Sequence, residues 1–163
     1  MRQLRVFLFG PPRIEFGGRR IEIGLRKAVA LFVYLVVNKQ PYSRDALATL
    51  FWPKTGQQTA LGNLRRALHR LNAAFDGELL AATRKTVEIN PQVDLWLDTR
   101  EFEQKVSACF SASLQPGRPF SGSWPEEAVC LPELEKAAAL YTQDFLAGFS
   151  LLDSPDFDEW QFF

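Results

Sequence analysis

The chain has 163 residues, of which 47% are hydrophobic, 13% aromatic and 23% charged. This composition suits one or two small globular domains and excludes a disordered or collagen-like chain. No apolar run approaches the roughly 18 residues that a membrane-spanning helix needs, so we expect no membrane partner.

The charges are unevenly divided along the chain, although they sum to zero. Residues 1–90 contain 15 lysines and arginines against 6 aspartates and glutamates, whereas residues 91–163 contain 4 against 13. A basic half of net charge +9 is thus followed by an acidic half of −9. A basic module suggests a polyanionic partner such as nucleic acid.

Cysteine and histidine are scarce, with two of the first and one of the second. These are too few for the usual four-ligand zinc site. A disulfide between Cys109 and Cys130 is possible, but no secretory signal precedes the first apolar stretch. We therefore expect a cytoplasmic protein with buried thiols, and no metal or other cofactor.

The first 24 residues predict a small antiparallel sheet. Short β-rich segments are separated by Gly10-Pro11-Pro12 and by Gly17-Gly18, which are turn signals. The expected strands are Leu4–Phe9, Arg13–Phe16 and Arg20–Ile23.

Three helices are expected next. A buried helix over Arg26–Asn38 precedes Pro41, and Ser43 is a candidate N-cap for a short helix over Arg44–Phe51. The third helix, Gln57–Phe75, has the clearest periodicity, with apolar residues spaced 3, 4, 3 and 4 apart along one narrow stripe. That stripe consists of Leu61, Leu64, Leu68, Leu71 and Phe75.

Two strands, Leu79–Thr83 and Thr86–Ile89, follow the third helix and form a hairpin with Arg84 and Lys85 at its tip. Strands, three helices and a hairpin, in that order, are typical of a winged helix-turn-helix domain. We therefore predict an α+β fold with a winged-helix DNA-binding domain at residues 1–92.

The acidic half, residues 93–163, is predicted to be a partial all-α segment. After a possible strand at Val93–Leu97, Asp98 is an N-cap candidate for a helix to about Ala112. Residues 113–125 read as a loop, and Pro132 fits the first turn of a last helix that reaches about Leu146. The aromatic tail, residues 149–163, is expected to pack against helices downstream of this chain, which would make it part of a longer protein.

The face of the third helix opposite its leucine stripe suits duplex DNA, because an α-helix fits the major groove, where base edges differ. Arginine can pair with guanine and asparagine with adenine. We expect Asn63, Arg66 and Arg70 to reach base edges, with Thr59 on the same face. The small residues Gly62 and Ala73 on this face would permit the helix to approach the groove closely. The residues expected at phosphates are Arg65, His69, Lys54, Arg84 and Lys85.

No catalytic constellation surrounds His69, so the chain is not expected to be an enzyme and no catalytic residue is assigned. The alternative function is a protein–protein interaction module, in which the winged helix and the acidic helices bind a partner or each other. Acidic helices folded over Arg66 and Arg70 would give an autoinhibited regulator. RNA binding is a weaker alternative, because side chains do not easily read the deep A-form groove.

Five segments of the basic half carry a resemblance to a known family: Leu61–Leu71, Leu79-Leu80, Thr83–Val87, Leu4–Pro12 and Leu50–Pro53. They resemble the winged-helix domain, of OmpR/PhoB type, of SARP-like bacterial transcriptional activators.

The end of the acidic half, Tyr141–Phe149 and Asp153–Trp160, resembles the start of the bacterial transcriptional activation domain, a TPR-like helical array in that family. The resemblance implies promoter binding, often to direct repeats, and activation through contact with RNA polymerase. Because an array buries its core by stacking several units, a homodimer formed through the exposed surface is a further expectation.

Overall fold

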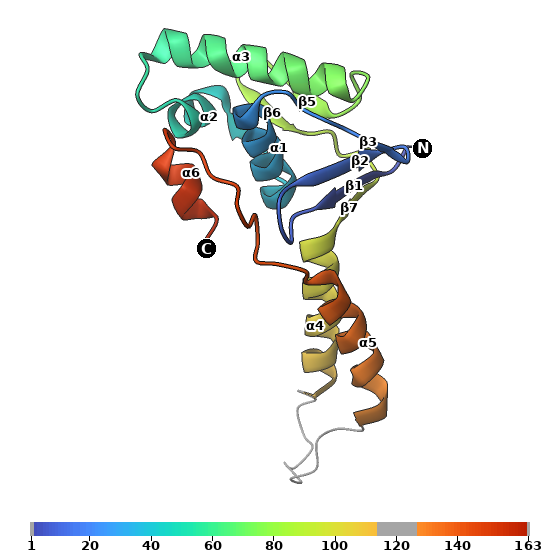
Figure 1. Ribbon diagram of the computed structural model, residues 1–163. Helices are drawn as coiled ribbons and strands as arrows, with labels where there is room; N and C mark the ends of the chain where they lie inside the picture. The colour runs from blue at the N-terminus through green and yellow to red at the C-terminus, as the bar shows by residue number, and fades with distance from the viewer. Residues whose placement is uncertain (1, 114–126, 163) are drawn as a thin grey trace.

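A computed structural model describes residues 2–113 and 127–162 (Figure 1). The chain is a mixed α+β protein. Its first sheet contains β1 (Leu4–Phe7), β2 (Arg13–Phe16), β3 (Arg19–Arg20) and β7 (Leu95–Leu97), in the order β3-β2-β1-β7. The first three strands form an antiparallel sheet as expected, but β1 ends at Phe7 rather than Phe9, and β3 is Arg19–Arg20 rather than Arg20–Ile23. Strand β7 pairs with β1 in parallel, Leu4 opposite Leu95. Alternate residues of β1 and β2 are buried, as expected when one face of a sheet covers a core.

The three expected helices are present: α1 (Arg26–Asn38), α2 (Arg44–Phe51) and α3 (Gln57–Ala74). Ser43 caps α2 as predicted, because its hydroxyl oxygen accepts a hydrogen bond from the Ala46 backbone N–H at 3.1 Å. The bounds of α1 and α2 agree with the sequence prediction, and α3 ends one residue earlier than expected.

A second sheet contains β4 (Tyr42–Ser43), β6 (Thr86–Ile89) and β5 (Leu80–Ala82), in the order β4-β6-β5. The predicted hairpin is therefore present, with Leu80 opposite Ile89. The extra strand β4 lies directly before α2 and fixes the start of that helix to the hairpin.

The core lies between the four-stranded sheet and the three helices. The Phe32 ring stacks on Phe75 at 5.5 Å between centroids, and Phe16 meets Phe75 edge-on at 5.6 Å. The leucine stripe of α3 faces this core: Leu64, Leu68 and Leu71 are buried. Burial of the stripe therefore orients the rest of α3.

Helices α4 (Asp98–Ser113) and α5 (Glu127–Leu140) pack together as a hairpin that extends away from the end of the molecule that carries α3 (Figure 1). The expected helix after Asp98 is confirmed. The last helix was predicted wrongly, because α5 begins before Pro132 and contains it, and ends well before Leu146. Residues 141–146 instead run back to the segment that follows β1, where the Leu146 N–H donates to the Leu8 carbonyl at 2.8 Å. The loop expected at 113–125 lies outside the described residues, apart from Ser113, which ends α4.

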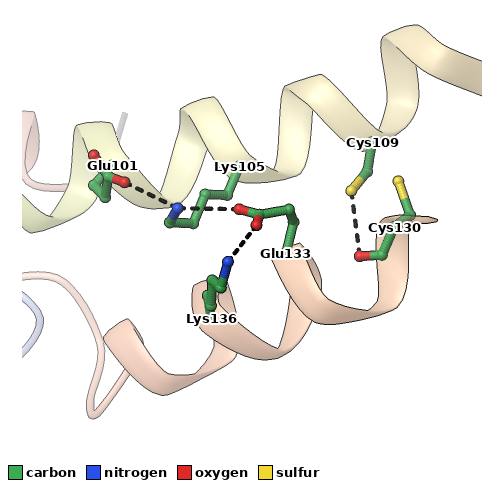
Figure 2. Close-up of polar contacts among 6 residues, drawn as sticks. All are labelled: Glu101, Lys105, Cys109, Cys130, Glu133 and Lys136. Atoms are coloured by element: carbon green, nitrogen blue, oxygen red, sulfur yellow. Dashed lines mark hydrogen bonds and ion pairs between the residues drawn. The ribbon is translucent and has the colours of Figure 1, made fainter. Parts of the chain in front are cut away.

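Polar contacts join α4 to α5 (Figure 2). The Lys105 ammonium lies 3.0 Å from a Glu101 carboxylate oxygen on its own helix and 3.1 Å from Glu133 on α5. The Cys109 thiol donates to the Cys130 carbonyl oxygen at 3.6 Å. Both cysteines are in the thiol form.

The aromatic tail was expected to pack against helices downstream, and this expectation is wrong. The tail returns to the basic half, where α6 (Pro155–Trp160) lies beside α2 (Figure 1). Phe157 is fully buried, 5.5 Å from the Phe51 ring, and Trp160 lies 4.9 Å from Tyr34. The core of the basic half is thus completed by the end of the acidic half.

Candidate nucleic-acid interface

The candidate interface begins with the outer face of α3, which is opposite the buried leucine stripe. Gly62 lies on this face, and a Cβ added there would meet no atom within 4 Å, so the space around it is open. Most of the predicted site residues on this helix are exposed: Thr59, Arg65, Arg66, His69 and Arg70. The acidic hairpin α4–α5 does not cover this face, because it lies at the opposite end of the molecule (Figure 1).

Asn63 differs from the other predicted site residues because it is half-buried. Its side-chain carbonyl oxygen accepts a hydrogen bond from the Arg66 guanidinium at 2.8 Å. The two residues are three apart on one helix, a spacing at which side chains meet. Asn63 therefore orients Arg66 and leaves its own amide NH₂ as the group with free donor capacity.

An open pocket brings together Asn63, Arg66 and Arg70 on the flank of α3 that faces α1 and the end of α2. Three residues that sequence reasoning did not assign to the site complete its lining: Leu25, Lys27 and Trp52. The Lys27 ammonium lies 5.3 Å from the centre of the Trp52 ring. The only sequence signal for Lys27 was its place in the basic half, because it is far from α3 along the chain.

Lys54 lies exposed in the turn between α2 and α3. Thr55 shapes this turn, since its backbone N–H and its hydroxyl donate to the Trp52 carbonyl oxygen at 3.2 and 3.0 Å. Lys54 therefore sits on an ordered turn rather than on α3 itself.

Arg84 and Lys85 are exposed at the turn between β5 and β6, as predicted. The Thr83 hydroxyl oxygen accepts from the Lys85 and Thr86 backbone N–H groups at 3.1 and 2.9 Å, which closes the turn. Arg44, the first residue of α2, donates from its side chain to the Thr83 carbonyl at 3.0 Å and from its backbone to the Lys85 carbonyl at 2.9 Å. The tip is thereby fixed to the start of α2.

Over residues 2–113 and 127–162, no group of three or more His, Cys, Asp or Glu residues could hold a metal ion. Nor does any helix there have the length and apolar character required to cross a membrane.

No protein-family model and no curated protein matches this chain. Among solved structures, the chain is similar to EmbR of Mycobacterium tuberculosis, solved in complex with a low-affinity phosphopeptide. The TM-score is 0.71 and the sequence identity 18%, over 99% of this chain and 41% of the EmbR chain. The likeness therefore covers both the basic and the acidic half, and this chain spans less than half of the EmbR chain. At this identity it shows the fold alone: the chain has an α+β fold similar to that of EmbR.

Proposed function

We propose that the chain is a sequence-specific regulator of transcription that binds double-stranded DNA. The observation that carries this proposal is the outer face of α3, where Arg66, His69 and Arg70 are exposed while the leucine stripe is buried. The likeness to EmbR, a SARP-family regulator, supports the same function class.

In the proposed complex, α3 enters the major groove with its outer face toward the bases. Arg66 and Arg70 pair with guanine edges and the Asn63 amide contacts an adjacent base. Contacts at the phosphates or base edges along the border of the groove come from Arg65, His69, Lys54 and Thr59. Phosphate contacts fix the register of the protein, whereas base contacts supply discrimination.

The turn between β5 and β6 acts as the wing. Arg84 and Lys85 contact the sugar-phosphate backbone or the neighbouring minor groove. We place the DNA-binding unit in residues 1–92 and an activating unit in residues 93–163. The activating unit is a TPR-like helical segment that contacts RNA polymerase in the bacterial cytoplasm. The proposed regulator needs no catalytic residue and no cofactor.

The test is binding of the full chain to a duplex selected from a random pool and to a shuffled duplex, each at several salt concentrations. Arg66→Ala should lower the ratio of selected to shuffled affinity by about tenfold, the scale of one lost bidentate base contact. Lys85→Ala should weaken both duplexes alike and reduce the slope of log K against log salt by about one.

Arg20→Ala is the matched control, because Arg20 is an exposed arginine on β3, outside the proposed interface. It removes the same charge and should leave the affinity ratio unchanged. If Arg66→Ala and Arg20→Ala behave alike, α3 does not read bases. If the chain retains no duplex even at low salt, it is not a DNA-binding protein.

A second candidate function, protein interaction, is favoured by one observation on α5. Leu131 and Leu134 are 57% and 40% exposed and lie three residues apart, so they share a face of the helix. Apolar surface of this kind suits contact with a protein, either RNA polymerase or a second copy in a homodimer.

Leu131→Glu should abolish capture of purified RNA polymerase without changing duplex affinity. Unchanged capture would exclude this face as the contact.

A further inference from the structure

The C-terminal segment of residues 149–160, here named the brace, contacts the element that leads into α3. Its contacts begin at α1, where the Arg26 guanidinium donates to the Ser150 carbonyl at 2.8 Å and stacks 4.6 Å from the centre of the Phe149 ring. They continue with Phe157, which is fully buried against Phe51. The brace thus spans α1 and α2 on the side that carries the candidate interface pocket.

The Phe51 carbonyl oxygen is the main polar anchor of the brace. Phe51 is the last residue of α2, and the last carbonyls of a helix have no partner within it. This oxygen accepts from the Lys27 ammonium at 2.6 Å and from the Ser154 hydroxyl at 2.8 Å. Ser154 is fully buried. A cation and a buried hydroxyl therefore fix the point at which the chain leaves α2 for α3.

Lys27 connects the brace to the candidate interface. Its ammonium lies 2.7 Å from a carboxylate oxygen of Asp153 in the brace, and its side chain is only 15% exposed. The same lysine lines the pocket that contains Arg66 and Arg70. A chain of contacts thus runs from Asp153 through Lys27 to the pocket beside α3.

We propose that the brace positions α3 for reading DNA, although it supplies no group that touches DNA. By holding Lys27 and the Phe51 carbonyl, Asp153 and Ser154 fix the turn at residues 52–56 and hence the direction in which α3 leaves α2. This inference rests on the function proposed above. Asp153 and Ser154 are positioning residues for Arg66, Arg70 and Asn63.

Electrostatics alone makes the opposite prediction. Asp153 is an anion beside a cationic pocket, so its removal would strengthen the attraction of any duplex to this face. Positioning instead predicts that Asp153→Asn weakens binding to the selected duplex while binding to the shuffled duplex holds or rises. The ratio of the two affinities therefore separates the two effects.

The experiment uses the full chain with Asp153→Asn, Ser154→Ala, Asp153→Glu and the matched control Asp156→Asn. Asp156 is an exposed residue of α6, so its substitution removes the same charge from the same segment. Asp153→Asn and Ser154→Ala should each lower the ratio of selected to shuffled affinity about fivefold, the scale of one lost hydrogen bond. Asp153→Glu should restore it, because Asp153 is 55% exposed and a longer carboxylate has room.

Hydrogen exchange of the free protein provides a readout that does not involve DNA. The backbone amides of Trp52 and Thr55, which donate to the Ala48 and Trp52 carbonyls, should exchange faster in Asp153→Asn and Ser154→Ala but not in Asp156→Asn. Unchanged exchange in both brace variants, or an affinity ratio equal to that of Asp156→Asn, would overturn the positioning role. If the unmodified chain binds no duplex, the DNA function fails. Faster exchange would still support control of the α2–α3 turn, and unchanged exchange would exclude it.

Discussion

At the scale of single residues, Asp98 shows how one buried carboxylate can connect two halves of a chain. Asp98 is 2% exposed, and its first oxygen accepts from the backbone N–H groups of Leu8 and Thr99 at 2.9 and 2.8 Å. Its second oxygen accepts from Leu8 and Phe9 at 2.8 and 3.0 Å. The end of β1 is thereby tied to the start of α4. The sequence indicated Asp98 as a helix cap but carried no signal for its partners directly after β1.

Asp98→Asn should destabilise the folded chain by about 1–3 kcal/mol, the penalty for leaving a buried donor unsatisfied. The asparagine NH₂ must replace one of two oxygens that both face N–H donors, so either orientation sets donor against donor. The free energy of unfolding from urea titration measures the effect. The exposed Asp156→Asn is the control and should change stability little. Equal stability of the two variants would show that the carboxylate is dispensable.

At the scale of elements, the α4–α5 hairpin is joined by charges around Glu133 (Figure 2). Glu133 accepts from Lys136 at 2.6 Å and from Lys105 at 3.1 Å. The hydrogen bond from Lys136, and then that from Lys105, hold the pKa of the Glu133 carboxyl below its ordinary value of 4.5. Hydrogen bonds to the carboxylates of Glu101 and then of Glu133 raise the pKa of Lys105 above its ordinary value of 10.5. These groups are partly open to solvent, so salt should weaken their attraction.

The lowered pKa of Glu133 predicts the direction in which stability changes with pH. A carboxyl whose pKa falls on folding stabilises the folded state above its unfolded value, and this contribution is lost as pH falls through the folded value. Glu133→Gln should therefore be less stable than the unmodified chain at pH 7, and the difference should vanish well below pH 4.5. Thermal unfolding at both pH values measures it. Glu135→Gln, at an exposed neighbour on α5, is the control. A difference that persists at low pH would mean that packing, not charge, is responsible.

At the scale of the whole molecule, contacts of several kinds cross the expected boundary at residue 92. Strand β7 completes the first sheet beside β1, and α6 covers Phe51 and Tyr34. The division into residues 1–92 and 93–163 therefore stays a proposal about function. For folding, the winged helix and the brace share one hydrophobic core.

A chain of residues 1–92 should unfold at a clearly lower urea concentration than the full chain, because it lacks β7 and exposes apolar surface at Phe51 and Tyr34. It should also bind a dye that reports exposed apolar surface. In the full chain, urea unfolding followed by tryptophan fluorescence and by far-UV circular dichroism should give the same midpoint, because both halves share one core. A stable, non-dye-binding fragment would instead support an autonomous domain.

The local elements were largely predictable because they depend on short-range chemistry. The period of Leu61, Leu64, Leu68 and Leu71 placed α3 and the direction of its outer face, and Ser43 marked the start of α2. The prediction failed at the last helix, where Pro132 looked like a first-turn residue. In the structure Pro132 lies beyond the first turn of α5, where proline has no N–H to donate to the preceding turn. The packing of α5 against α4 therefore outweighs this local preference.

The sequence by itself determined the winged-helix order, the separation of basic from acidic charge and the exposure of arginines on α3. These depend on periodicity and composition, which are local properties of the chain. Only the tertiary structure decided that β7 pairs with β1, that Lys27 and Trp52 join the pocket, and that the aromatic tail returns to cover Phe51. Most of these contacts join residues that lie far apart along the chain. Because apolar burial is non-directional, the sequence of an amphipathic tail does not indicate which surface the tail will cover.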